Sequence, residues 1–353
     1  MSNAHDSSAC IHCIIAPYVV EHMAQHDDAE IRKLAMDVVE CAAEARTARM
    51  MLATMPMMAA IPSPAQRKHR IVYDLKNKGM DDLPGTLMRE EGKPWKKKDK
   101  AAEEAYRHAG YVYDFYKKFF NRNSLDDNGM SLISSVHLRR KHNNAYWNGE
   151  QMVYGDGDGR RLIRFTKALD VVGHEFSHGV VTHTCNLEYK NESGALNEHF
   201  ADVFGILVLQ WKQNQDVTQS DWNIGKDCIG PEVDISALRT FKAGKAYEND
   251  PIMGTDLQPK HIDGKYTGSA DKGGVHINSG IPNHAFYVTA LALGGNAWER
   301  AGSMWYKTLD RLNSKSGFQE MVQATCSVAR DEHGAGSAEL KAVEKGWRAV
   351  GLM

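Results

Sequence analysis

The chain has 353 residues, which is enough for two domains of ordinary size. Its 43 lysines and arginines are balanced by 45 aspartates and glutamates, and this near-neutral charge argues against a nucleic-acid partner. No stretch reaches roughly 18 consecutive apolar residues, so no membrane partner is expected. The first residues carry neither a basic lead nor a long apolar run. We therefore expect no signal peptide, and either a cytoplasmic location or export by a non-classical route.

Six cysteines are present, and Cys10 and Cys13 form the one close pair, in CIHC. Without a secretory signal, free thiols in a reducing compartment are expected instead of a disulfide framework. Two interpretations of the close pair stay open. One thiolate could bind a catalytic metal, or both thiols could be inert, as free cysteines usually are.

Residues 1–65 are predicted to form a short N-terminal module. Residues 54–70 contain three prolines, small residues and a basic cluster, as is typical of an exposed linker that proteases cut. Within 29–52, apolar residues recur at helical spacing with charges between them. This pattern predicts an amphipathic helix that needs a partner surface, and its apolar face consists of Ile31, Leu34, Ala35, Val38, Val39 and Ala42.

The rest of the chain divides into a β-containing part, 66–188, and a helical part, 189–353, so the predicted fold class is α+β. Strands are expected at 70–75 and 131–138, a helix at 99–120 and a β-hairpin within 143–165. Thr166 is expected to be the N-cap of the first helix of a longer series. Helical patterns lie near 167–184, 195–213, 282–293, 296–312, 318–331 and 337–349.

The hexamer GHEFSH occupies 173–178, at the join between the two parts. His174 and His178 stand four residues apart, so on a helix they project from one face and can hold one Zn²⁺. Glu175 would lie beside the metal, where it can take a proton from a bound water. The alternative interpretation is a pair of surface histidines that bind no metal.

A catalytic zinc ion needs three protein ligands and one open position. Glu198 follows His178 by 20 residues in the sequence, which a turn between two helices can span. Asp202 lies one helical turn further and could accept the free N–H of a liganding histidine, and Asn197 could do the same for the other. In isolation, such residues are more often acids and amides on a solvated helix face.

Several motifs occur in the order found in one known family. The segments DVVGHEFSHGVV (170–181), NESGALNEHFADVFG (191–205) and DKGGVHINSGIPNHAFY (271–287) closely resemble the thermolysin-like zinc metallopeptidases. The segment NNAYWNGEQMVYGDGDG (143–159) resembles an edge strand and loop of that family. This resemblance covers about residue 68 to the C-terminus. It implies a β-rich N-terminal domain, an α-helical C-terminal domain and an active-site cleft between them.

The resemblance also implies a role for each matching residue. His174, His178 and Glu198 hold one zinc ion, and Glu175 is the general base. His276 and Tyr189 donate hydrogen bonds to the oxyanion that forms during cleavage, and Asp271 orients His276.

Substrate binding is implied in the same way. Asn144 and Ala145 bind the peptide backbone as an added strand, and Arg239 grips a substrate carbonyl. The pocket after the scissile bond is apolar, which predicts an endopeptidase that cuts before Leu, Phe, Ile or Val. Taken singly, its wall residues would be assigned to the core; they are Leu162, Phe165, Val171, Ile224 and Leu238.

The sequence departs from the family pattern at the double calcium site of secreted members. Asp170 and Asp221 match that site, but other positions carry Leu209, Asn223 and Lys226 where acids are expected. Because Ca²⁺ needs several oxygen ligands, at most one weak calcium site is expected.

The first 65 residues, which include IIAPYVV, resemble the short propeptide of the protealysin-like branch. Pro17 and Tyr18 match its cleft-blocking segment, and Ala16 replaces a second proline. We therefore expect residues 14–20 to occupy the substrate groove, and cleavage within 54–66 to release an active enzyme that acts on peptides and proteins.

Two rival functions remain at this point. A non-catalytic zinc-bearing scaffold could bind peptides or proteins, although it would not need Glu175, Tyr189 or His276. A zinc hydrolase acting on a small molecule is the second rival, and the strand-like edge at 143–149 favours an extended peptide instead.

Overall fold

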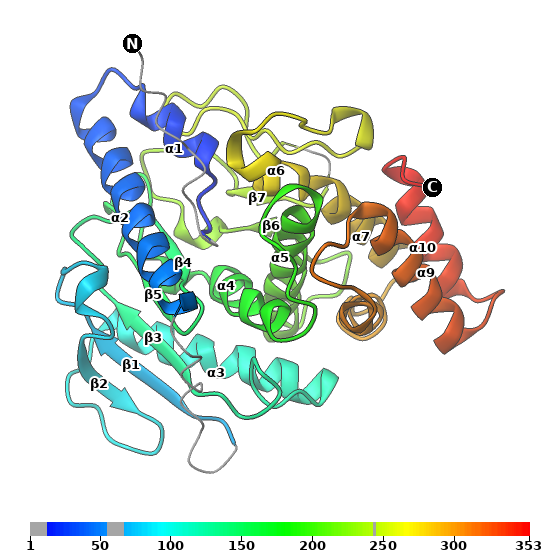
Figure 1. Cartoon of the computed structure of the whole chain (residues 1–353), viewed down its shortest axis with the longest axis horizontal. Coiled ribbons are helices and arrows are strands. Elements are labelled where there is room, and N and C mark those ends of the chain that lie inside the picture. Colours follow the sequence, from blue (N-terminus) through cyan, green and yellow to red (C-terminus); the bar gives the residue numbers. More distant parts are fainter. Residues whose placement is uncertain (1–12, 55–66, 243–244) are drawn as a thin grey trace.

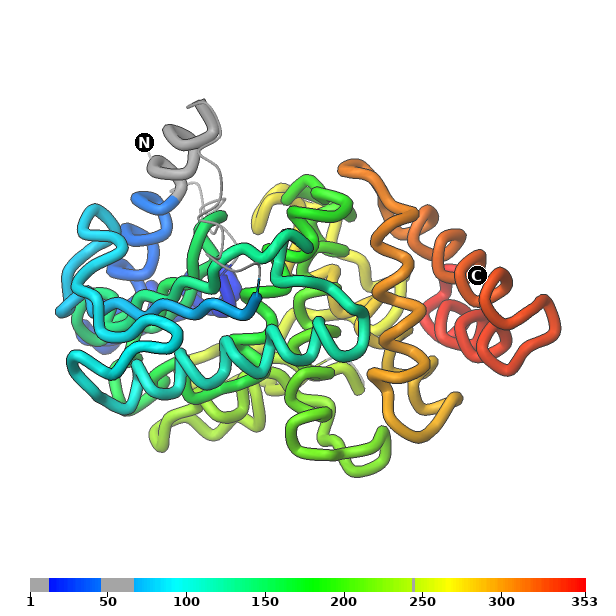
Figure 2. Tube along the Cα trace, turned by 90° about the horizontal axis from the view of Figure 1, so that it is seen from below, coloured from blue at the N-terminus to red at the C-terminus, as the bar shows by residue number. Residues whose placement is uncertain are grey.

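A computed structural model gives the structure of the chain and describes residues 13–54, 67–242 and 245–353. The expected cleavage segment 54–66 falls almost entirely outside these residues, and so does Cys10. The sheet and α3 lie at one end of the molecule and the last helices, α9 and α10, at the other (Figures 1 and 2). Where the structure describes the chain, no helix combines the length and apolar character needed to cross a membrane.

One five-stranded sheet forms the β-containing part. Its order is β2-β1-β3-β5-β4, with β1/β3 and β3/β5 parallel and the other two pairs antiparallel. The predicted strands and hairpin are confirmed, whereas β2 was not predicted because it is short, charged and mostly half-exposed. The strands are β1 (Arg70–Asp74), β2 (Thr86–Glu90), β3 (Leu132–Val136), β4 (Ala145–Trp147) and β5 (Met152–Tyr154).

The helix α3 (Lys100–Phe120) packs against the sheet and confirms the helix predicted at 99–120. The Asp99 side chain accepts a hydrogen bond from the Ala102 amide at 2.9 Å, which caps the first turn. Asn121 ends the helix in the left-handed conformation.

Two adjacent helices, α4 (Leu169–Thr182) and α5 (Asn191–Gln213), form the centre of the molecule. The expected N-cap at Thr166 is wrong, because α4 begins at Leu169 and Thr166 lies in a 3₁₀ turn, Phe165–Lys167. The Thr166 hydroxyl instead donates to the buried Glu104 carboxylate at 2.9 Å. A distant acid thus takes the hydroxyl that would have capped the helix.

The helical part otherwise follows the predicted series, with two additions that were missed. One is α6, whose first residues Asp271–Gly274 have left-handed φ angles and no helical sequence period. The other is a ribbon of β6 (Asn223–Ile224) and β7 (Arg239–Thr240), too short to show alternation. The helices are α6 (Ala270–Asn278), α7 (Gly280–Leu293), α8 (Ala301–Thr308), α9 (Phe318–His333) and α10 (Ala338–Ala349). Further 3₁₀ turns are Met80–Asp82, Lys226–Cys228, Ile262–Gly264 and Leu309–Arg311.

The N-terminal module contains α1 (Pro17–Ala24) and α2 (Ala29–Thr54), and α2 confirms the helix predicted at 29–52. Proline suits the first turn of α1 because its missing N–H would have no partner there. The two helices lie on the same side of the molecule as β4 and β5 (Figure 1). The predicted boundaries at 65/66 and 188/189 stay predictions.

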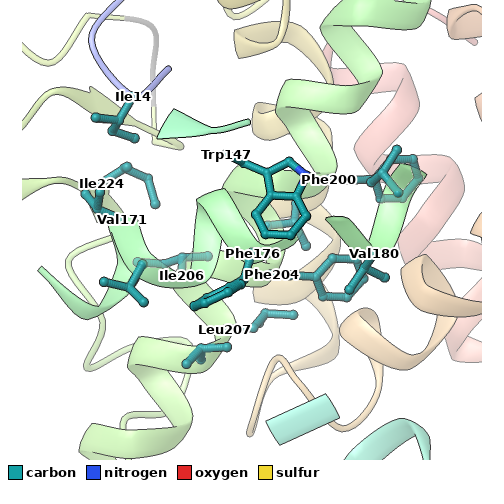
Figure 3. Packing of buried hydrophobic residues seen from close by; sticks show 14 of the residues in the cluster. Ile14, Trp147, Val171, Phe176, Val180, Phe200, Phe204, Ile206, Leu207 and Ile224 are labelled. Carbon is teal, nitrogen blue, oxygen red and sulfur yellow. The ribbon is translucent and has the colours of Figure 1, made fainter. Parts of the chain in front are cut away.

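Two glycines allow α4 and α5 to approach closely. A Cβ atom on Gly173 would lie 3.0 Å from the Gly205 Cα, and one on Gly205 would lie 2.5 Å from the Asp170 carbonyl oxygen. Large side chains on and around the two helices pack into one buried cluster, among them Trp147, Phe176, Phe200 and Phe204 (Figure 3).

Gly205→Ala should therefore force the two helices apart. We expect a loss of about 1–3 kcal/mol in unfolding free energy, as for other overpacked cores, together with weaker metal binding. Urea unfolding and zinc content would measure both. The matched control is Gly336→Ala, because a Cβ atom there meets nothing within 4 Å. Equal unfolding midpoints for the two variants would contradict the proposed role of the close crossing.

Candidate active site

The predicted metal ligands converge between α4 and α5. His174 and His178 come from α4, and their Nε2 atoms lie 3.1 Å apart. From α5, Glu198 places Oε2 3.5 Å from Nε2 of His174 and Oε1 3.5 Å from Nε2 of His178. All three side chains are buried. Within the described parts of the chain, this is the one group of three His, Cys, Asp or Glu residues arranged to hold a metal ion.

Hydrogen bonds fix both imidazoles in the tautomer that a metal requires. His174 donates from Nδ1 to Asp202 Oδ1 at 2.8 Å, and His178 donates from Nδ1 to Asn197 Oδ1 at 2.8 Å. Burial lowers the pKa of His178 to about 3, so this ring is neutral. A neutral ring with its proton on Nδ1 presents a lone pair at Nε2, and a cation shared by the two Nε2 atoms would bind both rings.

The donor set fits a tetrahedral zinc ion. Bonds of about 2.0–2.2 Å to such an ion would place its ligand atoms about 3.3–3.6 Å apart, close to the observed 3.1 and 3.5 Å. Oε2 of Glu198 is also buried without a hydrogen-bond partner among the described residues. Although burial alone would raise it, the surrounding imidazoles lower the pKa of Glu198, so this carboxylate is ionised.

Asp202 belongs to a buried network that reaches beyond the predicted residues. Its Oδ1 also accepts from Arg239 at 2.8 Å, and its Oδ2 accepts from Asn283 at 2.9 Å. The Asn283 side-chain oxygen lies 2.7 Å from Nδ1 of His199, whose Nε2 accepts from the indole N–H of Trp305 at 2.8 Å. Against the effect of burial, Arg239 holds the pKa of Asp202 far below its usual range.

His199, Asn283 and Trp305 were missed from the sequence. His199 stands next to Glu198 in the motif, but its hydrogen-bond partners lie 84 and 106 positions further along the chain. No local spacing links such residues.

Glu175 faces the edge strand of the sheet. Its Oε2 accepts a hydrogen bond from the Trp147 amide at 2.9 Å, while its Oε1 is buried without a partner among the described residues. Burial and the nearby carboxylate of Glu198 raise the pKa of Glu175. A carboxylate with one anchored oxygen, one unoccupied oxygen and a raised pKa has the properties of a general base.

His276, Tyr189 and Asp271 meet on the other side of the metal ligands. Nδ1 of His276 donates to Asp271 at 2.6 Å, and its Nε2 lies 3.1 Å from the Tyr189 hydroxyl, which donates to Glu198. Burial lowers the pKa of His276, but the carboxylates of Asp271 and Glu198 outweigh this effect and raise the pKa to about 9. The ring is therefore an imidazolium near neutral pH, with a proton on each nitrogen.

Residues 13–16 of the N-terminal module lie against these groups. The Cys13 carbonyl oxygen lies 3.1 Å from Nε2 of His276, and Arg239 donates to the Ile14 carbonyl oxygen at 2.8 Å. The Ile15 amide donates to Oδ1 of Asn144 at 3.1 Å. Cys13 also forms an antiparallel bridge to Tyr146 in β4, directly after Ala145. The segment thus extends the edge of the sheet.

The Ile14 side chain is buried next to Val171 and Ile224 (Figure 3). The same buried cluster contains the other three predicted pocket residues, Leu162, Phe165 and Leu238. The structure therefore places Asn144 and Arg239 on the backbone of residues 14 and 15, and the five predicted pocket residues in the same buried cluster as Ile14.

Comparison with known proteins agrees with this geometry. The family model described as "Thermolysin metallopeptidase, catalytic domain" matches residues 63–182, and "Thermolysin metallopeptidase, alpha-helical domain" matches residues 185–352. Protease PrtS of Photorhabdus sp. (strain Az29) is 46% identical over 289 residues, which cover 80% of this chain and 76% of that protein. The chain belongs to the thermolysin metallopeptidase family.

Two further proteins are similar to this chain over most of its length. The "Extracellular metalloprotease" of Pectobacterium carotovorum subsp. carotovorum is 42% identical over 292 residues, 82% of each chain. The solved precursor of protealysin, a metalloproteinase from Serratia proteamaculans, has a TM-score of 0.86 and 37% identity, and covers 97% of this chain and 100% of its own. Family membership confirms the predicted fold and a zinc metalloendopeptidase, and it disfavours the non-catalytic scaffold.

One expectation about the N-terminal module gains detail, and one needs correction. Within the stretch expected to occupy the groove, 14–20, the helix α1 begins at Pro17. The hydroxyl of Tyr18, in the first turn of α1, donates to Asp256 at 3.1 Å. Cys13 is disulfide-bonded and not the expected free thiol, so it offers no thiolate to a metal. The other cysteines that the structure describes are free and buried, as expected.

The region of the double calcium site in secreted family members has a different chemistry here. Oδ2 of Asp170 accepts from the Gly225 amide at 2.6 Å, and burial raises the pKa of Asp170 to about 6. Asp221 pairs with the Lys226 ammonium at 3.0 Å, and Leu209 packs against the core. The ammonium group of Lys226 thus pairs with one of the two acids that remain at this site.

Proposed function

We propose that the chain is the zymogen of a zinc endopeptidase in which His174, His178 and Glu198 hold the metal and Glu175 is the general base. The convergence of two imidazole Nε2 atoms and one carboxylate between α4 and α5 is the observation that supports this most strongly. A bound zinc ion supplies Lewis-acid chemistry, which makes a water molecule acidic enough to lose a proton near neutral pH.

The side chains supply the remaining chemistry. Glu175 takes a proton from the attacking water through its unoccupied oxygen and delivers it to the leaving amine. His276 and Tyr189 donate to the oxyanion that develops on the scissile carbonyl, and such donors are each worth about 2.7–4 kcal/mol. Asp271 keeps His276 protonated and oriented, and Asp202 and Asn197 orient the two liganding imidazoles.

Glu175→Gln tests this assignment. Glutamine keeps the size of the side chain but cannot take a proton, so kcat should fall by at least about 100-fold while zinc stays bound. Peptide cleavage and metal analysis of the linker-cut enzyme would measure both. The control is Glu299→Gln, a change of an exposed glutamate on the surface. If the Glu175→Gln enzyme keeps its activity, the base lies elsewhere; if the wild type also cuts nothing, the peptide-binding scaffold is the better interpretation.

Autoinhibition follows from the position of residues 13–16. The Cys13 carbonyl lies at the proposed oxyanion donor, so the Cys13–Ile14 peptide bond occupies the place of a scissile bond. Ile14 then fills the pocket for the residue after the cut, and Arg239 and Asn144 bind the backbone as they would bind a substrate. Because the pocket accepts isoleucine, we propose cleavage before Leu, Phe, Ile or Val.

Replacing Ile14 tests the pocket and the inhibition together. Ile14→Asp would bury a carboxylate in an apolar pocket, which costs several kcal/mol unless the segment leaves the cleft. The uncut chain should therefore gain activity on a short peptide, whereas Ile14→Leu should stay inhibited.

A peptide library cut by the processed enzyme should show Leu, Phe, Ile or Val after the cut. A strong preference for charged residues there would contradict the pocket assignment.

We also propose that the double calcium site is lost and that at most one weak calcium ion binds. Lys226 neutralises Asp221, and the Leu209 side chain offers no oxygen. Calorimetric titration of the metal-free chain should show no more than one calcium site, with an affinity raised by Lys226→Glu. Two tight calcium ions in the unaltered chain would contradict this proposal.

The cellular location and the binding partners of the protein are proposals. Peptides, proteins and the chain's own N-terminal module are the proposed partners. The name of the Pectobacterium relative favours export over a cytoplasmic location. Recovery of the protease from culture medium without cell lysis would test that choice.

A further inference from the structure

We propose that the processed enzyme carries a second substrate-binding surface, which binds an acidic amphipathic helix located C-terminal to the bond that is cut. This surface consists of Arg139, Lys141 and His142 around an apolar floor, and α2 covers it in the uncut chain. The proposal rests on the proposed function, because the surface is uncovered only when residues 13–54 leave the enzyme. We call it the basic surface.

Arg139 is the centre of the basic surface. Its guanidinium lies 2.8 Å from Asp37, 2.7 Å from Glu44 and 3.8 Å from Glu40, all on α2. Among the described residues, these three acids are the ion-pair partners of Arg139. Removal of α2 therefore leaves a cation with several hydrogen-bond donors and no carboxylate.

Lys141 and His142 extend the surface along the same loop. The Lys141 ammonium pairs with Glu30 at 2.9 Å, and the buried His142 donates to Asp37 at 2.6 Å. The other basic groups near α2, Arg160 and Arg161, keep Glu232 or Asp158 as partners within the catalytic part. Among the described residues, Arg139 and Lys141 thus depend on α2 for their ion pairs, and His142 depends on it for the hydrogen bond to Asp37.

An apolar floor adjoins these polar groups, and His142 contacts it through the Tyr146 hydroxyl. The α2 face that covers it is made of small side chains, Cys41, Ala42 and Ala45, which are all buried in the uncut chain. A helix with small apolar residues on one face and acids at its margins matches this surface in both shape and charge. The buried cluster that these α2 residues complete also contains Leu75, Met80, Leu138, Tyr146 and Val153, so removal of α2 takes away part of its cover.

The basic surface is connected to the substrate cleft. His142 lies 2.8 Å from the Tyr146 hydroxyl, and Tyr146 in turn bridges to Cys13 on the edge strand. In the proposed function, the Cys13–Ile14 bond lies where a substrate is cut, and α2 follows this bond in the chain. A substrate helix that occupies the place of α2 would therefore lie on the C-terminal side of its scissile bond.

Tethering explains why weak contacts can matter here. Exposed ion pairs contribute little one at a time and are screened by salt. When the cleft and the basic surface bind two parts of one chain, however, the second contact is intramolecular and occurs at a high effective concentration. The basic surface should therefore lower KM more than it changes kcat.

Peptides can test the proposal without altering the enzyme. The first joins a short sequence with a cleavable bond before Leu, a flexible linker of about 12 residues, and residues 28–45 of this chain with Cys41→Ala. The second carries Asn or Gln at all five acidic positions of that segment. With the zinc-loaded, processed enzyme, we expect KM of the acidic peptide to be at least about tenfold lower. The difference should disappear in about 0.5 M salt.

Enzyme variants and direct binding complete the test. Arg139→Gln with Lys141→Gln should remove the difference between the two peptides, whereas Lys341→Gln on α10 should keep it. Fluorescence anisotropy of labelled residues 28–45 measures binding even if neither peptide is cut, so failure of the endopeptidase assignment remains distinguishable. The uncut chain should not bind this segment, because α2 already covers the surface. Equal KM values for the two peptides, or equal binding of their helices, would overturn the proposal.

Discussion

The close crossing of α4 and α5 is the constraint on which the active site depends. Gly173 and Gly205 leave no side chain between the helices, so His174 from one and Glu198 from the other come within 3.5 Å. A side chain at either glycine would meet backbone atoms, some of them in the turn that carries His174. The ligand geometry is therefore a property of helix packing as much as of the three ligand side chains.

That packing also concentrates charge away from water. Glu175, Glu198 and Asp202 are all buried within one small region, where isolated carboxylates are unfavourable. Arg239 compensates part of this charge through Asp202, and His276 contributes a second cation. Oε2 of Glu198 and Oε1 of Glu175 nevertheless have no hydrogen-bond partner among the described residues. A bound dication and its water would satisfy both, which links the stability of this region to metal binding.

The sequence could predict what depends on local spacing. The helix face shared by His174 and His178, the hairpin that carries Asn144 and the amphipathic α2 all follow from residues a few positions apart. Thr166 shows the limit, because Glu104, 62 positions away, takes its hydroxyl from the helix end. The His199–Asn283–Trp305 chain and the Arg139–Asp37 pair are likewise tertiary contacts with no sequence period. Arg239 and His276 were named from the family resemblance and not from spacing, and the structure places both against residues 13–14.

The N-terminal module combines two kinds of contact that reinforce each other. Residues 13–16 make three backbone hydrogen bonds and bury one apolar side chain. A peptide substrate could make the same contacts, so these contacts alone give no reason for exceptional affinity. The ion pairs of α2 are weak singly, but they hold the module where its first residues re-enter the cleft whenever they leave. A cut in the linker would not by itself break either contact. It would convert an intramolecular inhibitor into a dissociable one, so activation would depend on dilution and salt as well as on proteolysis.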